Sequence, residues 1–219
     1  MNYADHVKKS MLLYAVTDRS WCGKETLQEQ VERALKGGAT CIQLREKTLD
    51  DDAFLKEALI LKELCRAYHV PLIVNDNVNV AIKCGADGIH VGQHDMDAKD
   101  IRALVGRKMI VGVSAQNVEQ AVLAEQGGAD YLGVGAVFAT ATKLDADAVS
   151  LATLKAICDA VALPTVAIGG ITRGNLLELA GSGVDGVALV SAIFGSEDIE
   201  AECRVLYSLA ERIDRKSVL

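Results

Sequence analysis

The sequence predicts an α/β fold in which eight parallel strands close into a (β/α)8 barrel, and three observations predict it. Four glycine-containing strings, GGAT, CGAD, GGAD and SGVD, recur along the chain, each after a helical pattern and before a short apolar run. Their central glycines are 43 to 55 residues apart, and each interval has room for two βα units of a barrel that typically holds ~250 residues. The runs between the strings are short and continuously apolar, as in strands buried on both faces.

The elements follow in order along the chain. Strands are expected at LLYAVT, PLIVN, MIVGVS and PTVAI, in addition to those that begin after the glycine strings. Amphipathic helices are expected over 25–36, 50–68 and 117–126, the second with acidic residues at its positive end. Each string ends a helix with a glycine suited to a left-handed turn. An open doubly wound sheet is the alternative, but no GxGxxG fingerprint opens the chain.

No linker divides the 219 residues, which contain only two prolines. The expected organisation is therefore a single TIM-barrel domain over residues 1–219, with a short N-terminal extension of about residues 1–10.

Composition excludes several classes of function. The net charge of -7 opposes binding to nucleic acid or an anionic membrane, and any anionic ligand must meet a local basic cluster. No apolar run approaches the ~20 residues that span a bilayer. The six cysteines are scattered without a CxxC pair, as in a cytoplasmic protein with reduced thiols. The sequence leaves both a monomer and a homo-oligomer open.

Polar residues follow nearly every apolar strand, on the side where a barrel forms its active site. The candidates at these strand ends are Gln43, Arg45, Lys47, Asn75, Asp76, Gln93, Asp95, Ser114, Thr140, Thr142 and Lys143.

Three basic residues at strand ends, Arg45, Lys47 and Lys143, stand out in an acidic chain. Two phosphoryl groups would need about this much positive charge, and arginine can bind two phosphate oxygens at once. Each residue alone is as compatible with ordinary solvated surface. The three together favour binding of phosphorylated substrates.

Asp76 and Asp95 end neighbouring strands and could share a hard cation. Mg2+ typically takes one or two carboxylates together with waters and phosphate oxygens. The alternative is that each aspartate caps a helix or turn. The adjacent basic cluster favours the metal site.

A third group predicts a phosphate site after the last two strands. Gly169 and Gly170 follow the seventh strand, and a turn at Ser191 follows the eighth. Backbone N–H groups at such a corner commonly bind phosphate in barrels. His90 lies within an apolar strand, and a hydrogen-bonded core histidine is the favoured interpretation there.

The ordered set QLREK, VNDN, GADGIHVGQHD, GVSAQ, TATK, AIGGI and VALVSAIF resembles the thiamine-phosphate synthase family over essentially the whole chain. The resemblance implies Mg2+ on Asp76 and Asp95, with Lys47, Ser114 and Lys143 as catalytic residues. It further implies a set of substrate contacts. Hydroxymethylpyrimidine diphosphate would be bound by Gln43, Arg45, Lys47, Asn75, Ser114 and Lys143. The thiazole phosphate would be bound by Thr140, Thr142, Gly170, Val190 and Ser191.

The resemblance also implies a mechanism in which diphosphate leaves first and the thiazole nitrogen then attacks the pyrimidine methylene cation. Two positions depart from the family pattern: Gln116 where many members have histidine, and Ala139 where many have proline. A thiazole tautomerase of the same barrel family is the closest rival, and it would rely on a histidine near position 116. A sugar-phosphate isomerase and a catalytically silent thiazole phosphate sensor are the more distant rivals.

Overall fold

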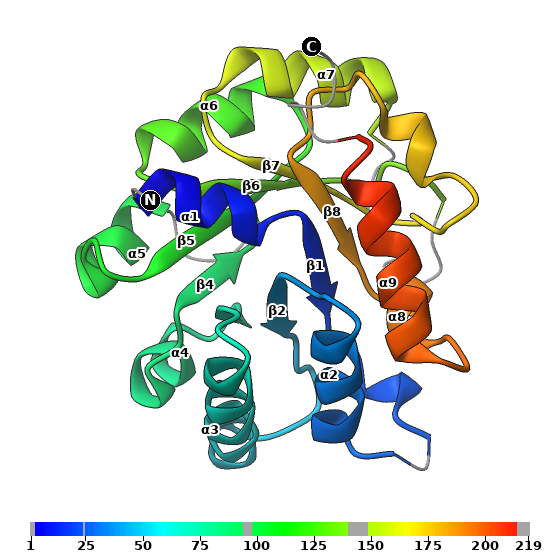
Figure 1. The fold of residues 1–219 in the computed structure, drawn as a ribbon. Helices are drawn as coiled ribbons and strands as arrows, with labels where there is room; N and C mark the ends of the chain where they lie inside the picture. Colours follow the sequence, from blue (N-terminus) through cyan, green and yellow to red (C-terminus); the bar gives the residue numbers. More distant parts are fainter. Residues whose placement is uncertain (1–2, 24, 94–97, 140–148, 214–219) are drawn as a thin grey trace.

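The computed structural model describes residues 3–23, 25–93, 98–139 and 149–213, and within them eight parallel strands form one closed barrel (Figure 1). Every strand pairs with its sequence neighbours, and the last strand pairs with the first. The predicted fold class is confirmed. The strands are β1 (Leu13–Val16), β2 (Cys41–Leu44), β3 (Leu72–Asn75), β4 (Gly88–Val91), β5 (Ile110–Ala115), β6 (Tyr131–Val134), β7 (Thr165–Ile168) and β8 (Gly186–Leu189).

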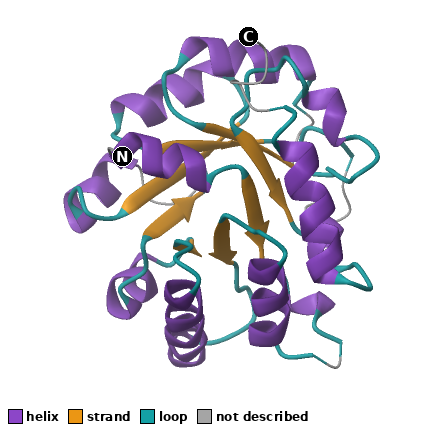
Figure 2. Ribbon diagram, viewed as in Figure 1, coloured by secondary structure: helices purple, strands orange, loops and turns teal. Residues whose placement is uncertain are grey.

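Helices surround the barrel as an outer layer (Figure 2). Two short 3-10 helices, η1 (Arg19–Trp21) and η2 (Leu176–Leu179), follow β1 and β7. Within the described ranges, none of the helices is both long and apolar enough to cross a membrane. The α-helices are α1 (Tyr3–Ser10), α2 (Leu27–Lys36), α3 (Asp51–Ala67), α4 (Val78–Cys84), α5 (Ala98–Val105), α6 (Val118–Gln126), α7 (Leu151–Ala160), α8 (Ser191–Phe194) and α9 (Ile199–Ala210).

Short polar side chains determine where the helices begin. Thr26 accepts a hydrogen bond from the backbone N–H of Glu29, whose carboxylate accepts one from the backbone N–H of Thr26. Asp50 and Asn117 cap α3 and α6 through their side-chain oxygens. Such a cap contributes about 1 kcal/mol to helix stability. The three predicted helices consequently agree with α2, α3 and α6 to within two residues at each end.

Each of the four glycine strings ties two consecutive strands together at the N-terminal end of the barrel through one side-chain hydrogen bond, which we call a clamp. Their central glycines all have positive φ, between 64° and 99°, as predicted for turns that end helices. The side chain two residues later then accepts a hydrogen bond of 2.8 or 2.9 Å from a backbone N–H near the start of the preceding strand. The clamping residues are Thr40 on Leu13, Asp87 on Leu72, Asp130 on Val111 and Asp185 on Thr165. Each clamp joins two consecutive strands, which explains the two-unit spacing of the strings.

We expect the Asp130 clamp to contribute strongly to stability. Its carboxylate accepts from Val111 N–H at 2.8 Å and pairs with Arg102 at 2.5 Å, and the Asp130 side chain is only 18% exposed. Asp130→Ala leaves the buried Val111 N–H without its partner and removes the ion pair of Arg102, which keeps its hydrogen bonds to backbone carbonyls, so the free energy of unfolding should fall by about 2 kcal/mol. The midpoint of thermal unfolding should fall by roughly 4–8 °C.

The control for this prediction is Asp159→Ala. Asp159 also pairs with a basic residue, Lys155, but its side chain is 60% exposed. An exposed i,i+4 pair contributes only about 0.5 kcal/mol. Equal shifts of the two variants in thermal unfolding would contradict the clamp.

Among the described residues, apolar side chains fill the N-terminal end of the barrel interior. Val7 and Met11 of the α1 segment pack there against inward-facing side chains of the strands. These include Tyr14 and Tyr131, which are fully buried. A separate and larger cluster of apolar side chains lies between the strands and the outer helices. The C-terminal end of the interior is therefore the one left to hold a ligand.

Candidate active site

A cavity of about 400 Å³ lies at the C-terminal ends of the strands, where barrels of this class form their active sites. Its wall mixes apolar residues with a few polar groups that point inward from different strands, as expected of a small-molecule site. Nine of the predicted site residues line it: Gln43, Arg45, Asn75, Gln93, Ser114, Gly169, Gly170, Val190 and Ser191.

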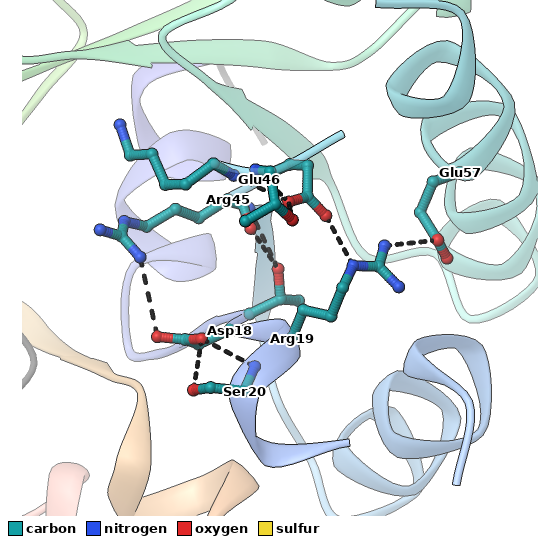
Figure 3. A network of polar contacts seen from close by, with 9 residues as sticks. Asp18, Arg19, Ser20, Arg45, Glu46 and Glu57 are labelled. Atoms are coloured by element: carbon teal, nitrogen blue, oxygen red, sulfur yellow. Dashed lines mark hydrogen bonds and ion pairs between the residues drawn. The ribbon is translucent and has the colours of Figure 1, made fainter. Parts of the chain in front are cut away.

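Arg45 brings positive charge to this cavity directly after β2. Its backbone N–H donates to the buried Thr17 hydroxyl at 3.0 Å, so the end of β1 holds it in place. Its guanidinium lies 3.7 Å from the Asp18 carboxylate (Figure 3). The side chain is 25% exposed. These contacts hold Arg45 in place, and its guanidinium remains accessible to an anionic ligand.

Glu46 organises the loop that carries Arg45 and Lys47, a role that the sequence did not reveal. Its carboxylate accepts from Arg19 at 2.8 Å (Figure 3). It also accepts from the backbone N–H groups of Lys47 and Thr48. Burial alone would raise the pKa of Glu46, but these hydrogen bonds outweigh it and hold the pKa at about 2. Arg19 also pairs with Glu57 of α3 at 2.8 Å, which ties the loop to the outer layer.

Glu46→Gln should lower stability in a pH-dependent way. The folded-state pKa of about 2 lies below the ~4.3 of an unfolded glutamate, so the contribution is complete at neutral pH and is lost as pH falls toward 2. The variant should be less stable by on the order of 2 kcal/mol at pH 7. Urea unfolding at several pH values measures this difference, which should shrink below pH ~4. A difference that stays constant from pH 7 to pH 3 would contradict the assignment.

Asp76 stands at the end of β3 in an uncommon backbone conformation. Its φ is 61°, a left-handed value that aspartate adopts more readily than most residues but that still stores strain. Its backbone N–H donates to the carbonyl of His90 at 2.9 Å, which holds this conformation. Its carboxylate pairs with the ammonium of Lys47 at 2.7 Å. Lys47 and Asp76, predicted for different roles, therefore lie side by side.

The residues at this position are compatible with a hard cation. The Asp76 carboxylate is 33% exposed and follows Asn75, which lines the cavity. Within the described part of the chain, no three His, Cys, Asp or Glu side chains gather into a metal site. Mg2+ needs only one or two carboxylates when waters and phosphate oxygens complete its shell. Asp95, predicted as the second carboxylate, lies outside the described residues.

A continuous chain of hydrogen bonds runs beneath the cavity; we call it the floor chain. It starts at Gln43, whose amide nitrogen donates to the Tyr14 hydroxyl at 2.8 Å. Tyr14 bonds Tyr131 at 2.8 Å, Tyr131 bonds Nδ1 of His90 at 2.9 Å, and Nε2 of His90 bonds Ser114 at 3.0 Å. Burial raises the pKa of both tyrosines well above the usual range, so both phenols are protonated.

His90 is both a core residue and a residue of the site. It is buried and hydrogen-bonded as predicted, yet it also lines the cavity. Its link to Tyr131 could not be read from the sequence, because the two residues lie on different strands and 41 positions apart. An inward-facing polar residue near the end of an otherwise apolar strand was the available signal.

Gly170, Val190 and Ser191, predicted to form a phosphate site, all line the cavity after β7 and β8; we call this part of the cavity the phosphate corner. Gly170 has a φ of 65°, and a Cβ there would lie 2.4 Å from the carbonyl oxygen of Ala139, so only glycine fits. Its own carbonyl accepts from the Asn175 amide at 2.9 Å. Ser191, predicted in a turn, instead opens the short helix α8, directly after Val190. The first backbone N–H groups of such a helix suit an anion.

Three further predicted residues, Thr140, Thr142 and Lys143, lie outside the described residues, like Asp95. The chain on either side of 140–148 is held at the cavity. The N–H of Val149 donates to the carbonyl of Ala136, which lines the cavity, at 2.8 Å.

Comparison with known proteins gives a consistent result. A family model described as thiamine monophosphate synthase matches residues 13–193. A protein of Ruminiclostridium cellulolyticum named thiamine-phosphate synthase is 46% identical over 197 residues, covering 90% of this chain and 94% of its own length. A protein of the same name from Clostridium acetobutylicum is 43% identical over 204 residues, covering 93% and 97%.

Solved structures agree at the level of the fold. Thiamine phosphate pyrophosphorylase from Pyrococcus furiosus superposes with a TM-score of 0.88 at 37% identity, covering 94% of this chain and 98% of the other. A 3-hexulose-6-phosphate synthase superposes with a TM-score of 0.66 at 17% identity, covering 91% and 99%. At that identity the second likeness concerns the barrel alone.

Proposed function

The chain belongs to the thiamine monophosphate synthase family, and from this premise we infer that it is the transferase that makes thiamine phosphate. It joins 4-amino-2-methyl-5-hydroxymethylpyrimidine diphosphate to 4-methyl-5-(2-phosphoethyl)thiazole and releases diphosphate. With the carboxylated tautomer of the thiazole phosphate as substrate, CO2 is released as well. The observation that carries this assignment is the composition of the cavity. Arg45 and the neighbouring Lys47 stand at one side and the phosphate corner at Gly170 and Ser191 at another, which gives one place for each phosphorylated substrate.

The pyrimidine diphosphate occupies the side of the cavity formed by β2 to β5. Gln43 and Ser114 line this part and bind the heterocycle. Arg45 and Asn75 line it too and bind the diphosphate, arginine through two oxygens at once. The ammonium of Lys47 completes the charge around the leaving group, and Lys143 is assigned the same role.

The reaction needs placement and charge neutralisation more than proton transfer. The C–O bond between the pyrimidine methylene and the diphosphate breaks first, and its electron pair leaves with the diphosphate. The lone pair of the thiazole nitrogen then forms the new C–N bond to the methylene carbon. Basic groups aimed at the departing oxygens lower the barrier to the first step, because negative charge develops there.

Mg2+ is the metal proposed for this site, held by Asp76 and Asp95. When bound, it neutralises part of the diphosphate charge and so makes the diphosphate a better leaving group. Asp76 already forms an ion pair with Lys47 at 2.7 Å. Asp76 would thus hold the metal and also keep Lys47 next to the diphosphate, which would link the metal site to the leaving-group site.

The thiazole phosphate occupies the corner of Gly170, Val190 and Ser191, with Thr140 and Thr142 as further donors. The positive φ of Gly170 exposes backbone groups that a side chain would cover. The first N–H groups of α8 and the Ser191 hydroxyl add donors for the phosphate oxygens. In this proposal the thiazole phosphate lies at the ends of β7 and β8, and the diphosphate lies beside Arg45 after β2.

The thiazole tautomerase is the competing assignment, and Gln116 argues against it. Gln116 lines the cavity at the position where that activity would rely on a histidine. A glutamine amide neither gives up nor takes a proton near neutral pH, so it cannot serve as the general base of an isomerisation. The synthase reaction needs no such base.

A direct test incubates the purified protein with both substrates and Mg2+ and follows thiamine phosphate after conversion to fluorescent thiochrome. Product is expected only when both substrates are present. A parallel incubation with the thiazole alone monitors its isomerisation. Isomerised thiazole without any thiamine phosphate would replace the synthase assignment by the tautomerase.

A further inference from the structure

The floor chain is built into the barrel. Its two ends, Gln43 and Ser114, line the cavity, whereas Tyr131 in the middle is fully buried and does not line it. Two glycines, one on β5 and one on β6, leave room for the side chains of the floor chain. A Cβ at Gly112 would lie 2.1 Å from the ring of Tyr131, and a Cβ at Gly133 would lie 3.0 Å from the ring of His90.

The floor chain has a direction that follows from counting protons. The Gln43 amide nitrogen donates to Tyr14, so the Tyr14 hydroxyl proton is available for Tyr131. With the Tyr14 proton in the bond between the two hydroxyls, the proton of Tyr131 is left for Nδ1 of His90. A neutral imidazole with an accepting Nδ1 carries its proton on Nε2, and this N–H donates to the Ser114 oxygen.

Because of this direction, one end of the floor chain can accept a hydrogen bond from a ligand and the other end can donate one. At one end the amide nitrogen of Gln43 is turned to Tyr14, so its carbonyl oxygen is the group that can accept from a ligand. At the other end the Ser114 oxygen accepts from His90, so its hydroxyl proton can be donated to a ligand. Reversing either bond of Tyr131 would leave one hydroxyl accepting two hydrogen bonds with its own proton unpaired.

We propose that the floor chain selects an aminopyrimidine over the corresponding oxopyrimidine, with Tyr14, Tyr131 and His90 as positioning residues for this specificity. The choice of substrate atoms rests on the proposed function. The 4-amino group donates to the carbonyl oxygen of Gln43, and a ring nitrogen accepts from the Ser114 hydroxyl. A 4-oxo group is itself an acceptor, so its oxygen would face the carbonyl oxygen of Gln43 without a hydrogen bond between them. Mismatched buried polar groups of this kind give large discrimination.

The test compares kcat/KM for the 4-amino substrate and for its 4-oxo analogue. The wild type should prefer the amino substrate by at least about 100-fold. Tyr131→Phe keeps the ring and the packing but cuts the chain without touching the cavity. The Tyr14 proton can then turn to Gln43, the amide can flip, and the preference should fall by about tenfold or more.

Tyr68→Phe is the matched control. It also removes one tyrosine hydroxyl and one hydrogen bond, from Tyr68 to Glu32 at 3.1 Å, but on the outer helices. Its amino-to-oxo ratio should equal that of the wild type. A ratio that is the same in the Tyr131→Phe variant as in the wild type would overturn the proposal.

A second measurement does not depend on activity. Nitrogen-15 NMR of the imidazole groups reports which ring nitrogen carries the proton, and loss of one signal set in His90→Gln identifies His90 among the four histidines. The wild type should show the Nε2–H form of His90, and the Nδ1–H form would overturn the direction of the chain. A folded wild type that makes no thiamine phosphate would instead contradict the proposed function, and the His90 tautomer would still decide the direction.

Discussion

Asp76→Ala is expected to lower kcat/KM for thiamine phosphate formation by at least about 100-fold, which corresponds to a barrier about 2.7 kcal/mol higher. It is also expected to raise the Mg2+ concentration for half-maximal activity by about tenfold or more. The reason is that Asp76 has a backbone with φ at 61° and a carboxylate that is partly exposed beside the cavity. A strained, accessible carboxylate next to a leaving-group site fits a metal ligand better than a structural cap.

The same substitution distinguishes a metal ligand from a mere partner of Lys47. If Asp76 only held Lys47 through their 2.7 Å ion pair, the variant would lose rate while its Mg2+ titration stayed unchanged. Asp159→Ala, which removes the exposed partner of Lys155 on α7, serves as the control and should leave both rate and titration unaltered. Measuring the rate across a Mg2+ titration for the wild type, Asp76→Ala and Asp159→Ala distinguishes the two roles of Asp76.

Lys47→Ala is expected to reduce kcat by about 100-fold, with a smaller change in KM for the pyrimidine diphosphate. The side chain of Lys47 is 54% exposed, and its ammonium pairs with Asp76 beside the site. Because negative charge grows on the diphosphate as the C–O bond breaks, we expect the lysine to stabilise the transition state more than the bound substrate. Lys47→Arg retains the charge and should recover a large part of the rate.

A purely binding role for Lys47 would give the opposite pattern. KM would then rise while kcat stayed the same, because substrate and transition state would lose the same interaction. Lys155→Ala is the matched control, since its exposed ammonium pairs with Asp159 in the same way but lies on the outer helix α7. Steady-state kinetics over a range of both substrates measures kcat and KM separately.

Much of the fold could be predicted because it depends on local signals. The four glycine strings end helices with positive φ, and their last residues clamp consecutive strands, so the spacing of the strings reports the number of βα units. The residues at strand ends were predictable for the same reason, since every strand of a barrel delivers its C-terminal residues to one face. Gln43, Arg45, Asn75 and Ser114 all reach the cavity in this way.

The parts that escaped prediction depend on contacts between distant strands. Tyr14 and Tyr131 lie 117 positions apart within apolar runs and look like ordinary core residues, yet their hydroxyls meet at 2.8 Å. Glu46 stands between two basic residues in QLREK and looks like a spacer, although its carboxylate shapes the loop that carries them. Side-chain direction across a closed barrel cannot be read from the order of residues.

The measurement that tests the central claim most directly is the stoichiometry of a single reaction mixture. Purified protein, both substrates and Mg2+ are combined, and thiamine phosphate and released diphosphate are quantified over time. We expect equal amounts of the two products, and neither when the metal is chelated or the thiazole is omitted. Diphosphate released without thiamine phosphate, or no product from the folded protein with Mg2+ present, would contradict the assignment of this cavity as a synthase site.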